Sequence, residues 1–384
     1  AKTAESDKML GLSFQGQGQL DLAFEKFRGC PVNDELLEIM YYLALDFERK
    51  RQLNKAGSVY HFIEQHDLNY RDIAARKKAI EAAERTPQLG NAGITATRSE
   101  SLLTGIDHLE KPTLGRYQVE KELGKGAMGI VYLGVDPKIN RTVAIKTMKL
   151  SDQFEDQALA EAKQRFLREA ESAGRLNHPH IVTVYDAGEE QELAYIAMEY
   201  LQGKELVEFS HVDNLLPGPM VLELMAQVAD ALDYAHDQGI IHRDIKPANI
   251  MYDEEKQTIK ITDFGIARIT DSSSTKTGSV MGTPSYMAPE QFAGEKIDGR
   301  ADLFSLGVLT YQLITGECPF RGGSIAELMY AITHHEPKSP ETLCPGLPDC
   351  VNQIIFKAIA KNRDDRYNTG AEMAAALRAC KENG

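Results

Sequence analysis

The sequence predicts an α+β protein in which an all-α module precedes a two-lobed part, with a first lobe mainly of strands and a second mainly of helices. Residues 1–85 are rich in Ala, Leu, Glu, Lys and Gln and almost free of proline, which favours helix. Residues 117–149 contain strand-like runs around glycine-containing turns. From residue 202 onward the chain is predominantly helical, with Pro/Gly breaks at 316–323 and 337–348.

The composition narrows the classes of function. The 384-residue chain has room for two or three domains, and its 42% apolar content supports ordinary buried cores. A formal net charge of −14 disfavours general binding to nucleic acid or anionic lipid. The longest apolar run, residues 303–314, is interrupted by polar residues and is too short to span a bilayer. We therefore expect a cytoplasmic chain without a membrane segment of its own.

The cysteines fall in no CxxC or CxH spacing. Neither a zinc site nor a disulfide framework is indicated, and a reducing compartment is expected. The five cysteines are Cys30, Cys318, Cys344, Cys350 and Cys380.

A repeat is present in the helical region. Its period and its order of large and small positions match the tetratricopeptide helix-turn-helix pattern. We expect residues 5–66 to form two repeats and residues 70–85 to form a capping helix. A plain helical bundle is the alternative, because the Trp and Pro positions of the pattern are missing. Leu10, Phe14, Ala23 and Phe27 recur 33 residues later as Leu43, Phe47, Ala56 and Tyr60, and the capping helix is expected to place Ile73, Ala74, Ile80 and Ala83 on its inner face.

Residues 86–114 shift to Thr, Ser, Gly and Asn and are predicted to be a linker between this module (1–85) and the two-lobed part (115–384). Its hydroxyl groups are candidate phosphorylation sites, although a solvated linker has the same composition.

A glycine-rich loop follows the first strand of the two-lobed part. It reads Gly124, Lys125, Gly126, Ala127, Met128, Gly129, and a β-branched run follows it rather than a helix. The glycines are therefore expected in a hairpin, where backbone amides can approach a triphosphate and Val131 can cover the base. A dinucleotide-binding fold would require a helix at this point.

Lys146 ends the next apolar strand, and a charged group there is costly to bury without a partner. Residues 158–176 are predicted to be helical, and Glu169 lies on the apolar face of that helix. We expect Glu169 to pair with Lys146, which would then hold the α- and β-phosphates. Glu171 is the alternative partner. Two strand-like runs, 181–185 and 193–198, then lead to a short connection suited to a hinge that could bind an adenine edge.

The stretch from His242 to Asn249, HRDIKPAN, places several polar groups between apolar runs. Asp244 is the expected acid–base residue beside a substrate hydroxyl, and Lys246 can offset the charge of a phosphoryl group. Asn249 and Asp263 are the expected ligands of Mg²⁺.

Two further residues have expected structural roles in this part of the chain. Asp302 is expected to accept backbone N–H bonds beneath the catalytic loop. Arg366 is expected to pair with Glu290.

The loop at residues 268–282 has more hydroxyl groups than a turn needs. Thr275, Thr277 and Ser279 are candidate phosphorylation sites, with Arg243 as a partner for the added phosphate.

The ordered set of glycine loop, VAIK, HRDxKPxN, DFG and APE resembles a bacterial eukaryotic-type (Hanks) Ser/Thr protein kinase domain over residues 115 to 380. The resemblance implies a first lobe at 115–198 and a second at 202–384. It extends to kinases with a preceding tetratricopeptide-like segment. Some of these carry a membrane-anchored CHASE2 sensor upstream, so the chain is expected either as a cytoplasmic protein or as the cytoplasmic part of such a sensor.

The resemblance also implies an activity and further contacts. The chain is expected to transfer the γ-phosphate of ATP, with Mg²⁺, to Ser or Thr of protein substrates, and to phosphorylate its own activation loop. Tetratricopeptide-like repeats imply docking of a partner or of another part of the chain. The implied contacts are Met198 as gatekeeper, Glu199 and Leu201 as hinge contacts, Glu205 near the ribose, Ala144 and Met251 on either side of the adenine, and Thr283 against Asp244 and Lys246.

Overall fold

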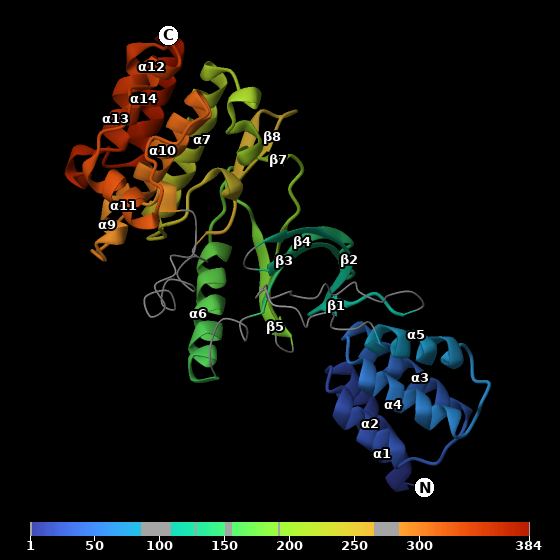
Figure 1. Cartoon of the computed structure of the whole chain (residues 1–384). Coiled ribbons are helices and arrows are strands. Elements are labelled where there is room, and N and C mark those ends of the chain that lie inside the picture. Colours follow the sequence, from blue (N-terminus) through green and yellow to red (C-terminus); the bar gives the residue numbers. More distant parts are fainter. Residues whose placement is uncertain are drawn as a thin grey trace. The chain divides into compact units, whose positions relative to one another are not determined.

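The structure is a computed structural model that describes residues 2–85, 109–126, 129–149, 156–190, 193–264 and 284–383 (Figure 1). It divides into two compact units, Ala1–Asp152 with Glu189–Tyr195, and Gln153–Gly188 with Ile196–Gly384. The first unit combines the N-terminal helices with the first strands of the predicted first lobe.

Five helices form the N-terminal part of the first unit, which we call the helical module (residues 2–85). They are α1 (Lys2–Gly16), α2 (Leu20–Arg28), α3 (Asp34–Arg49), α4 (Leu53–Glu64) and α5 (Ile73–Arg85). The start of α3 has a local cause, because the side chain of Asn33 accepts a hydrogen bond from the backbone N–H of Leu36 at 2.8 Å. The predicted capping helix is present as α5.

Small and large positions of the predicted repeat pack together. An added Cβ at Gly11 would lie 2.4 Å from the ring of Phe27, so only glycine lets α1 approach α2 this closely. The corresponding residue in the next helix pair, Ala44, is fully buried. Leu10 departs from the pattern with 42% of its surface exposed, while its counterpart Leu43 is buried.

The predicted inner face of α5 is partly wrong. Ile73 and Ile80 are buried, but Ala74 is exposed. Arg76 lies between the two isoleucines at helical spacing and is drawn inward by the buried carboxylate of Glu48, at 2.7 Å. A polar contact with another helix therefore determines which face of α5 is turned inward.

Four antiparallel strands follow in the first unit, which we call the first-lobe sheet: β1 (Thr113–Leu114), β2 (Tyr117–Gly126), β3 (Gly129–Asp136) and β4 (Arg141–Lys149). The full sheet has the order β1-β2-β3-β4-β6-β5, and the division between the units passes through β5 (Val184–Glu190) and β6 (Leu193–Glu199). Residues 109–114 of the predicted linker are thus partly built into the sheet, while residues 86–108 lie outside the described residues.

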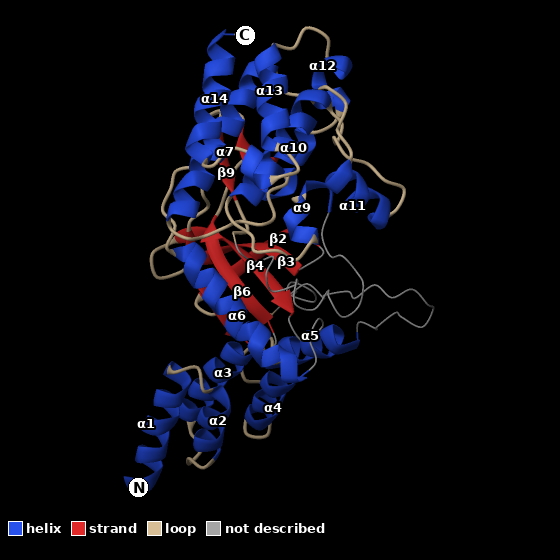
Figure 2. Ribbon diagram, turned by 90° about the vertical axis from the view of Figure 1, so that its left-hand side faces the viewer, coloured by secondary structure: helices blue, strands red, loops and turns tan. Residues whose placement is uncertain are grey.

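The second unit is mainly helical, as expected. Its helices are α6 (Asp156–Gly174), α7 (Gly218–Asp237), α9 (Pro289–Phe292), α10 (Arg300–Thr315), α11 (Ile325–His334), α12 (Pro340–Leu343), α13 (Asp349–Ala358) and α14 (Gly370–Asn383). Figure 2 shows α7, α10, α13 and α14 side by side, and their apolar residues form one continuous core. A small sheet of β7 (Lys204–Glu205), β8 (Ile250–Asp253) and β9 (Thr258–Ile261) lies in the same unit.

One expectation from the cysteines is corrected. Cys350 and Cys380 form a disulfide between α13 and α14. The two residues are 30 positions apart, with no characteristic spacing, so only the packing of the two helices brings their sulfur atoms together.

No helix among the residues that the structure describes is long and apolar enough to cross a membrane.

A buried ion pair fixes the second unit, as expected. The guanidinium group of Arg366 is fully buried and donates two hydrogen bonds to the carboxylate of Glu290, at 2.7 and 2.9 Å. It also donates to the carbonyl oxygens of Ala360, Lys361 and Arg300. The bidentate geometry and the added carbonyl acceptors compensate the loss of water around both charges.

Replacing Arg366 with Leu is predicted to lower the free energy of unfolding by about 3 kcal/mol, because the carboxylate of Glu290 would stay buried without its charged partner. Urea denaturation followed by circular dichroism measures this change. The control is Arg175→Leu, which removes an exposed pair with Glu171 and should change the midpoint little. Equal effects of the two substitutions would contradict the assignment.

Candidate active site

The stretch from His242 to Asn249 lies between α7 and β8 in the second unit. Its apolar member, Ile245, is fully buried, which anchors the middle of the loop in the core. The two polar neighbours of Ile245, Asp244 and Lys246, are partly exposed and are held in place by this anchor.

A buried carboxylate holds the start of this loop. Asp302, in the first turn of α10, accepts the backbone N–H of His242 at 2.8 Å and of Arg243 at 2.7 Å. The expected role of Asp302 is confirmed. Its Oδ2 atom also lies 2.8 Å from Nε2 of His236, a residue of α7 that the sequence analysis did not identify. No motif contains His236, so only the packing of α7 against α10 could have found it.

The charge of Asp302 is maintained by these partners. Burial alone raises the pKa of its carboxyl group, but the hydrogen bond from His236, the nearby ring of His242 and the backbone N–H of Arg243 outweigh burial and hold the pKa below its ordinary value. The carboxylate is therefore ionised at neutral pH and presents both oxygens to the loop.

His242 links the loop to the segment after β9. Its ring is fully buried, its Nε2 lies 2.8 Å from the carbonyl oxygen of Thr262, and its Nδ1 accepts the backbone N–H of Asp244. Nδ1 is therefore the acceptor of this ring and Nε2 its donor. The ring also meets Phe264 edge to face, at 4.6 Å between centroids.

Asp244, Lys246 and Asn249 are brought together as a cluster. The Oδ2 atom of Asp244 accepts Nζ of Lys246 at 2.7 Å and Nδ2 of Asn249 at 2.9 Å. The same Nδ2 donates to the backbone carbonyl of Asp244 at 2.8 Å. The carboxylate is thus fixed by two donors, while about a quarter of its surface (26%) stays accessible to a substrate.

Two residues of the site adopt left-handed backbone conformations. Arg243 has φ 70° and Asp263 has φ 65°, a region that side chains other than glycine rarely occupy. Strain of this kind persists only where surrounding contacts impose it, and the backbone N–H of Arg243 is held by Asp302.

The residues present fit a divalent cation. Because Nδ2 of Asn249 is engaged with Asp244, the amide has Oδ1 as its remaining acceptor atom. Loss of water first, and the carboxylate of Asp263 second, raise the pKa of Glu205, so the carboxylate of Asp263 lies close enough to act on Glu205. Within the described residues no group of three or more His, Cys, Asp or Glu could hold a metal by itself. Mg²⁺ held here would rely on phosphate oxygens for further ligands.

The candidate nucleotide residues of the first unit share one face of the first-lobe sheet. Val131 is the direct neighbour of Gly124 on β2 and of Lys146 on β4. Ala144 lies two residues from Lys146 and therefore on the same face. This row places a glycine, a β-branched side chain and a lysine side by side, as the predicted hairpin requires.

Gly129 is needed at the turn of this hairpin. Its φ is 152°, and an added Cβ would lie 1.7 Å from the carbonyl oxygen of Thr147. Lys125 and Gly126 pair with Ile130 and Gly129 across the hairpin, while Ala127 and Met128 lie outside the described residues.

The packing of helix α6 favours Glu169 over Glu171 as the predicted partner of Lys146. Phe166 and Ala170 are buried beside Glu169, whereas Glu171 is exposed and accepts a hydrogen bond from Arg175 at 2.7 Å. Lys146 and Glu169 belong to different units, and their pairing stays a prediction.

The predicted hinge residues Met198, Glu199 and Leu201 follow one another in the second unit, after the division in β6. The side chain of Glu199 accepts a hydrogen bond from Nζ of Lys260 at 2.9 Å, and its backbone N–H donates to the carbonyl oxygen of Thr183 at 2.9 Å. Glu205 on β7 pairs with Met251 on β8. The proposed phosphorylation sites Thr275, Thr277 and Ser279, and the substrate contact Thr283, lie outside the described residues.

Comparison with known proteins covers the two-lobed part. The family of the protein kinase domain matches residues 117–377. The serine/threonine-protein kinase PknB of Mycobacterium leprae is 42% identical over 268 residues, which cover 68% of this chain and 42% of that protein. PknB of Mycobacterium tuberculosis is 41% identical over 269 residues, which cover 68% of this chain and 42% of that protein. The chain thus spans about two fifths of the length of these curated relatives.

A solved structure is also similar. The crystal structure of the Mycobacterium tuberculosis PknI kinase domain is 32% identical, with a TM-score of 0.57, and the match covers 70% of this chain and 97% of that one.

The role of Asp302 predicts a pH dependence. Because its pKa is lower in the folded state, its contribution to stability is present above its ordinary pKa of about 4 and is lost as the pH falls through the folded value. Asp302→Asn is therefore predicted to lower the free energy of unfolding at pH 7 by about 2 kcal/mol, the cost of a charged hydrogen bond. The difference from the wild-type chain should shrink below pH 4 or so. Urea denaturation across this range measures it.

The matched control for this prediction is Asp213→Asn, at an exposed carboxylate. A constant difference between Asp302→Asn and the wild-type chain at all pH values would argue against an ionised carboxylate beneath the loop.

Proposed function

Because the chain belongs to the protein kinase family, we propose that it is an ATP-dependent Ser/Thr protein kinase of bacterial signalling, transferring the γ-phosphate of ATP to hydroxyl groups of protein substrates. The observation that carries this proposal is the carboxylate of Asp244, held by Lys246 and Asn249 on a loop fixed by Asp302. This arrangement suits a group that must meet a substrate hydroxyl in one orientation.

Asp244 is the proposed catalytic base. Its Oδ2 is engaged by two donors, which keeps the carboxylate in place while its accessible surface accepts or orients the proton of the attacking hydroxyl. Lys246, already within hydrogen-bond distance of Asp244, can also offset the charge of the transferred phosphoryl group. Asn249 and Asp263 would hold Mg²⁺, which supplies charge stabilisation at the phosphates when bound.

The nucleotide is assigned to both units. In the first unit, the glycine loop with Lys125, Ala127 and Met128 would cover the phosphates, and Lys146 would hold them with Glu169 as its partner. Met198, Glu199, Leu201 and Met251 would bound the adenine together with Val131 and Ala144. Glu205 would contact the ribose, and Thr283 the substrate side of the loop.

Regulation is proposed at the segment that carries Thr275, Thr277 and Ser279. Arg243 adjoins the catalytic base, so a phosphate paired with its guanidinium group would act directly on the loop that holds Asp244. The proposed source of this phosphate is the kinase itself.

The helical module is proposed to be tetratricopeptide-like and to dock a protein partner or another part of the chain. The buried repeat positions Ala23, Phe27, Ala44 and Phe47 support the repeat. The proposed location is the cytoplasm, either as a separate protein or as the cytoplasmic part of a membrane-anchored sensor kinase.

Asp244→Asn is predicted to lower phosphate transfer by a factor of about 10³ or more, because the amide cannot accept the proton. Peptide mass spectrometry after incubation with Mg-ATP should find phosphate on residues 271–283 of the wild-type chain and not of the variant. The control, Asp253→Asn, makes the same chemical change on β8 and should keep the phosphate. Equal phosphorylation of all three chains would reject Asp244 as the base.

Substituting both Thr275 and Thr277 with Ala is predicted to lower activity toward a basic protein substrate, because Arg243 would lack its phosphate partner. Initial rates with labelled ATP test this. Unchanged rates would remove the two threonines from the regulation of the kinase.

A further inference from the structure

The segment that connects the helical module to the first-lobe sheet is short and is hydrogen-bonded at both ends. The side chain of Leu109 packs against the core of the module, and the backbone N–H of Glu110 donates to Glu48 at 3.0 Å. The carbonyl oxygen of Pro112 already accepts a hydrogen bond from β2, at 2.8 Å. Glu110 is thus bound to the module and Pro112 to the sheet, and only Lys111 lies between them.

The module end of this junction is a charge network built on a buried carboxylate. Glu48 is fully buried and accepts the hydroxyl of Tyr60 and the guanidinium group of Arg76, each at 2.7 Å. The carboxylate of Glu110 accepts Arg49 at 3.2 Å and Arg76 at 3.5 Å. Glu110 is thus held both by its backbone and by its side chain.

The sheet end is a closed three-way contact, which we call the clamp (Lys50, Glu190 and Gly115). Nζ of Lys50 lies 2.6 Å from Oε1 of Glu190 and 3.3 Å from the carbonyl oxygen of Gly115. The other oxygen of Glu190 accepts the backbone N–H of Gly115 at 2.6 Å. Lys50 follows α3, and Glu190 ends β5, so the clamp joins the module to two places in the sheet.

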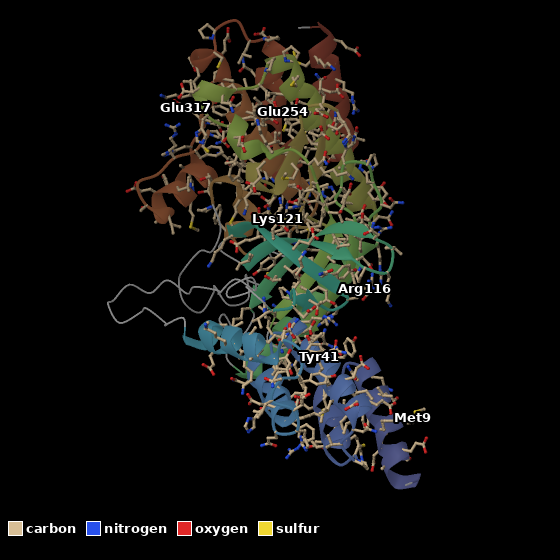
Figure 3. All side chains as sticks on the ribbon, turned by 90° about the vertical axis from the view of Figure 1, so that its right-hand side faces the viewer. Met9, Tyr41, Arg116, Lys121, Glu254 and Glu317 are labelled. Carbon is tan, nitrogen blue, oxygen red and sulfur yellow. A yellow bond between two sulfur atoms is a disulfide. The ribbon has the colours of Figure 1, made fainter. Side chains whose placement is uncertain are left out.

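The position of Gly115 has no room for a side chain. Its φ is 56°, and an added Cβ would lie 2.1 Å from the hydroxyl oxygen of Tyr195. Figure 3 labels Tyr41 in the module and Arg116, which follows Gly115 of the clamp and directly precedes β2. Arg116 in turn donates to Asp136 at 2.8 Å, which ties the turn to the end of β3.

An exposed ion pair usually contributes little to stability, but the clamp differs from such a pair in two ways. Its charged groups are mostly covered, with 26% of the Lys50 side chain and 16% of the Glu190 side chain exposed. Lys50 also serves two acceptors at once, Glu190 and the carbonyl oxygen of Gly115, so separating the module from the sheet would remove the shared donor of both.

We propose that the helical module is a docked extension of the first-lobe sheet, held by the clamp and by Glu110, so that module and sheet move as one body. Lys50 and Glu190 are then positioning residues. This inference goes beyond the proposed function, which assigns the module only the docking of partners. The grouping of Ala1–Asp152 with Glu189–Tyr195 into one compact unit agrees with it.

The inference links the module to the candidate nucleotide site. β2 begins two residues after Gly115 and ends at Gly126 of the glycine loop. A partner that displaced the module from the clamp would therefore act on the strand that carries Gly124 and Gly126. Binding at the module is expected to change the mobility of that loop without any contact to the nucleotide.

Hydrogen–deuterium exchange of the full chain tests the docking, with Lys50→Met as the first variant. This substitution removes the ammonium group and keeps the apolar stem. Glu190→Gln removes the charge and keeps an oxygen that can accept Gly115, and the double variant completes the cycle. The matched control is Lys55→Met, because Lys55 pairs with Asp21 inside the module at 2.7 Å.

Lys50→Met is expected to raise exchange in residues 109–119 by about tenfold, the size of one charged hydrogen bond. It should add little in the Glu190→Gln background, and Lys55→Met should leave these residues unchanged. Wild-type exchange at 109–119 in Lys50→Met, additive effects in the double variant, or an equal rise in Lys55→Met would each overturn the proposal. Neither ATP nor a substrate enters the measurement, so its failure would leave the proposed kinase activity untouched.

Discussion

The carboxylate of Asp302 is the constraint on which the candidate active site depends. It lies in the first turn of α10, completely buried, and binds the backbone N–H groups of His242 and Arg243. A charge in that position is costly unless it is paired, and the partners here are the loop itself and His236. The same contacts that keep Asp302 ionised therefore fix the loop, and the strained backbone of Arg243 is tolerated because both neighbouring amides are held.

From this anchor the arrangement of the loop follows step by step. His242 is buried, and its hydrogen bond with the carbonyl oxygen of Thr262 ties the loop to the segment that carries Asp263. Asp244 is held by Lys246 and by the amide nitrogen of Asn249. One set of hydrogen bonds thus positions the proposed base Asp244 and the proposed metal ligand Asn249 on the loop. Preorganised charges of this kind need no rearrangement when phosphate is transferred.

The sequence predicted those features whose cause lies in local spacing. Glycines before a β-branched run predict a hairpin, and Gly129 has the backbone that only glycine adopts easily. The roles of Asp302 and Arg366 were also predicted, because each follows from its position in a known set of motifs. Features that depend on distant packing were missed. His236 belongs to no motif, and the disulfide of Cys350 with Cys380 depends on how two helices meet.

The face of α5 illustrates the same limit. The spacing of apolar residues predicted that Ala74 would face inward. Instead, the fully buried Glu48 of α3 draws Arg76 to that face. One buried carboxylate in each unit, Glu48 and Asp302, thus organises contacts between segments far apart in the sequence. Asp302 was recognised from its motif, but Glu48 belongs to none, and acidic residues are rarely buried.

The central claim, that Asp302 holds the loop from His242 to Asn249 through its backbone, is tested most directly by amide exchange rates from nuclear magnetic resonance. The amides of His242 and Arg243 should exchange at least about a hundredfold more slowly than those of the exposed residues Gln202 and Gly203. Asp302→Asn should bring the rates closer together. Equally fast exchange at all four positions in the wild-type chain would mean that the loop is not held by Asp302, and the account of the site would fail.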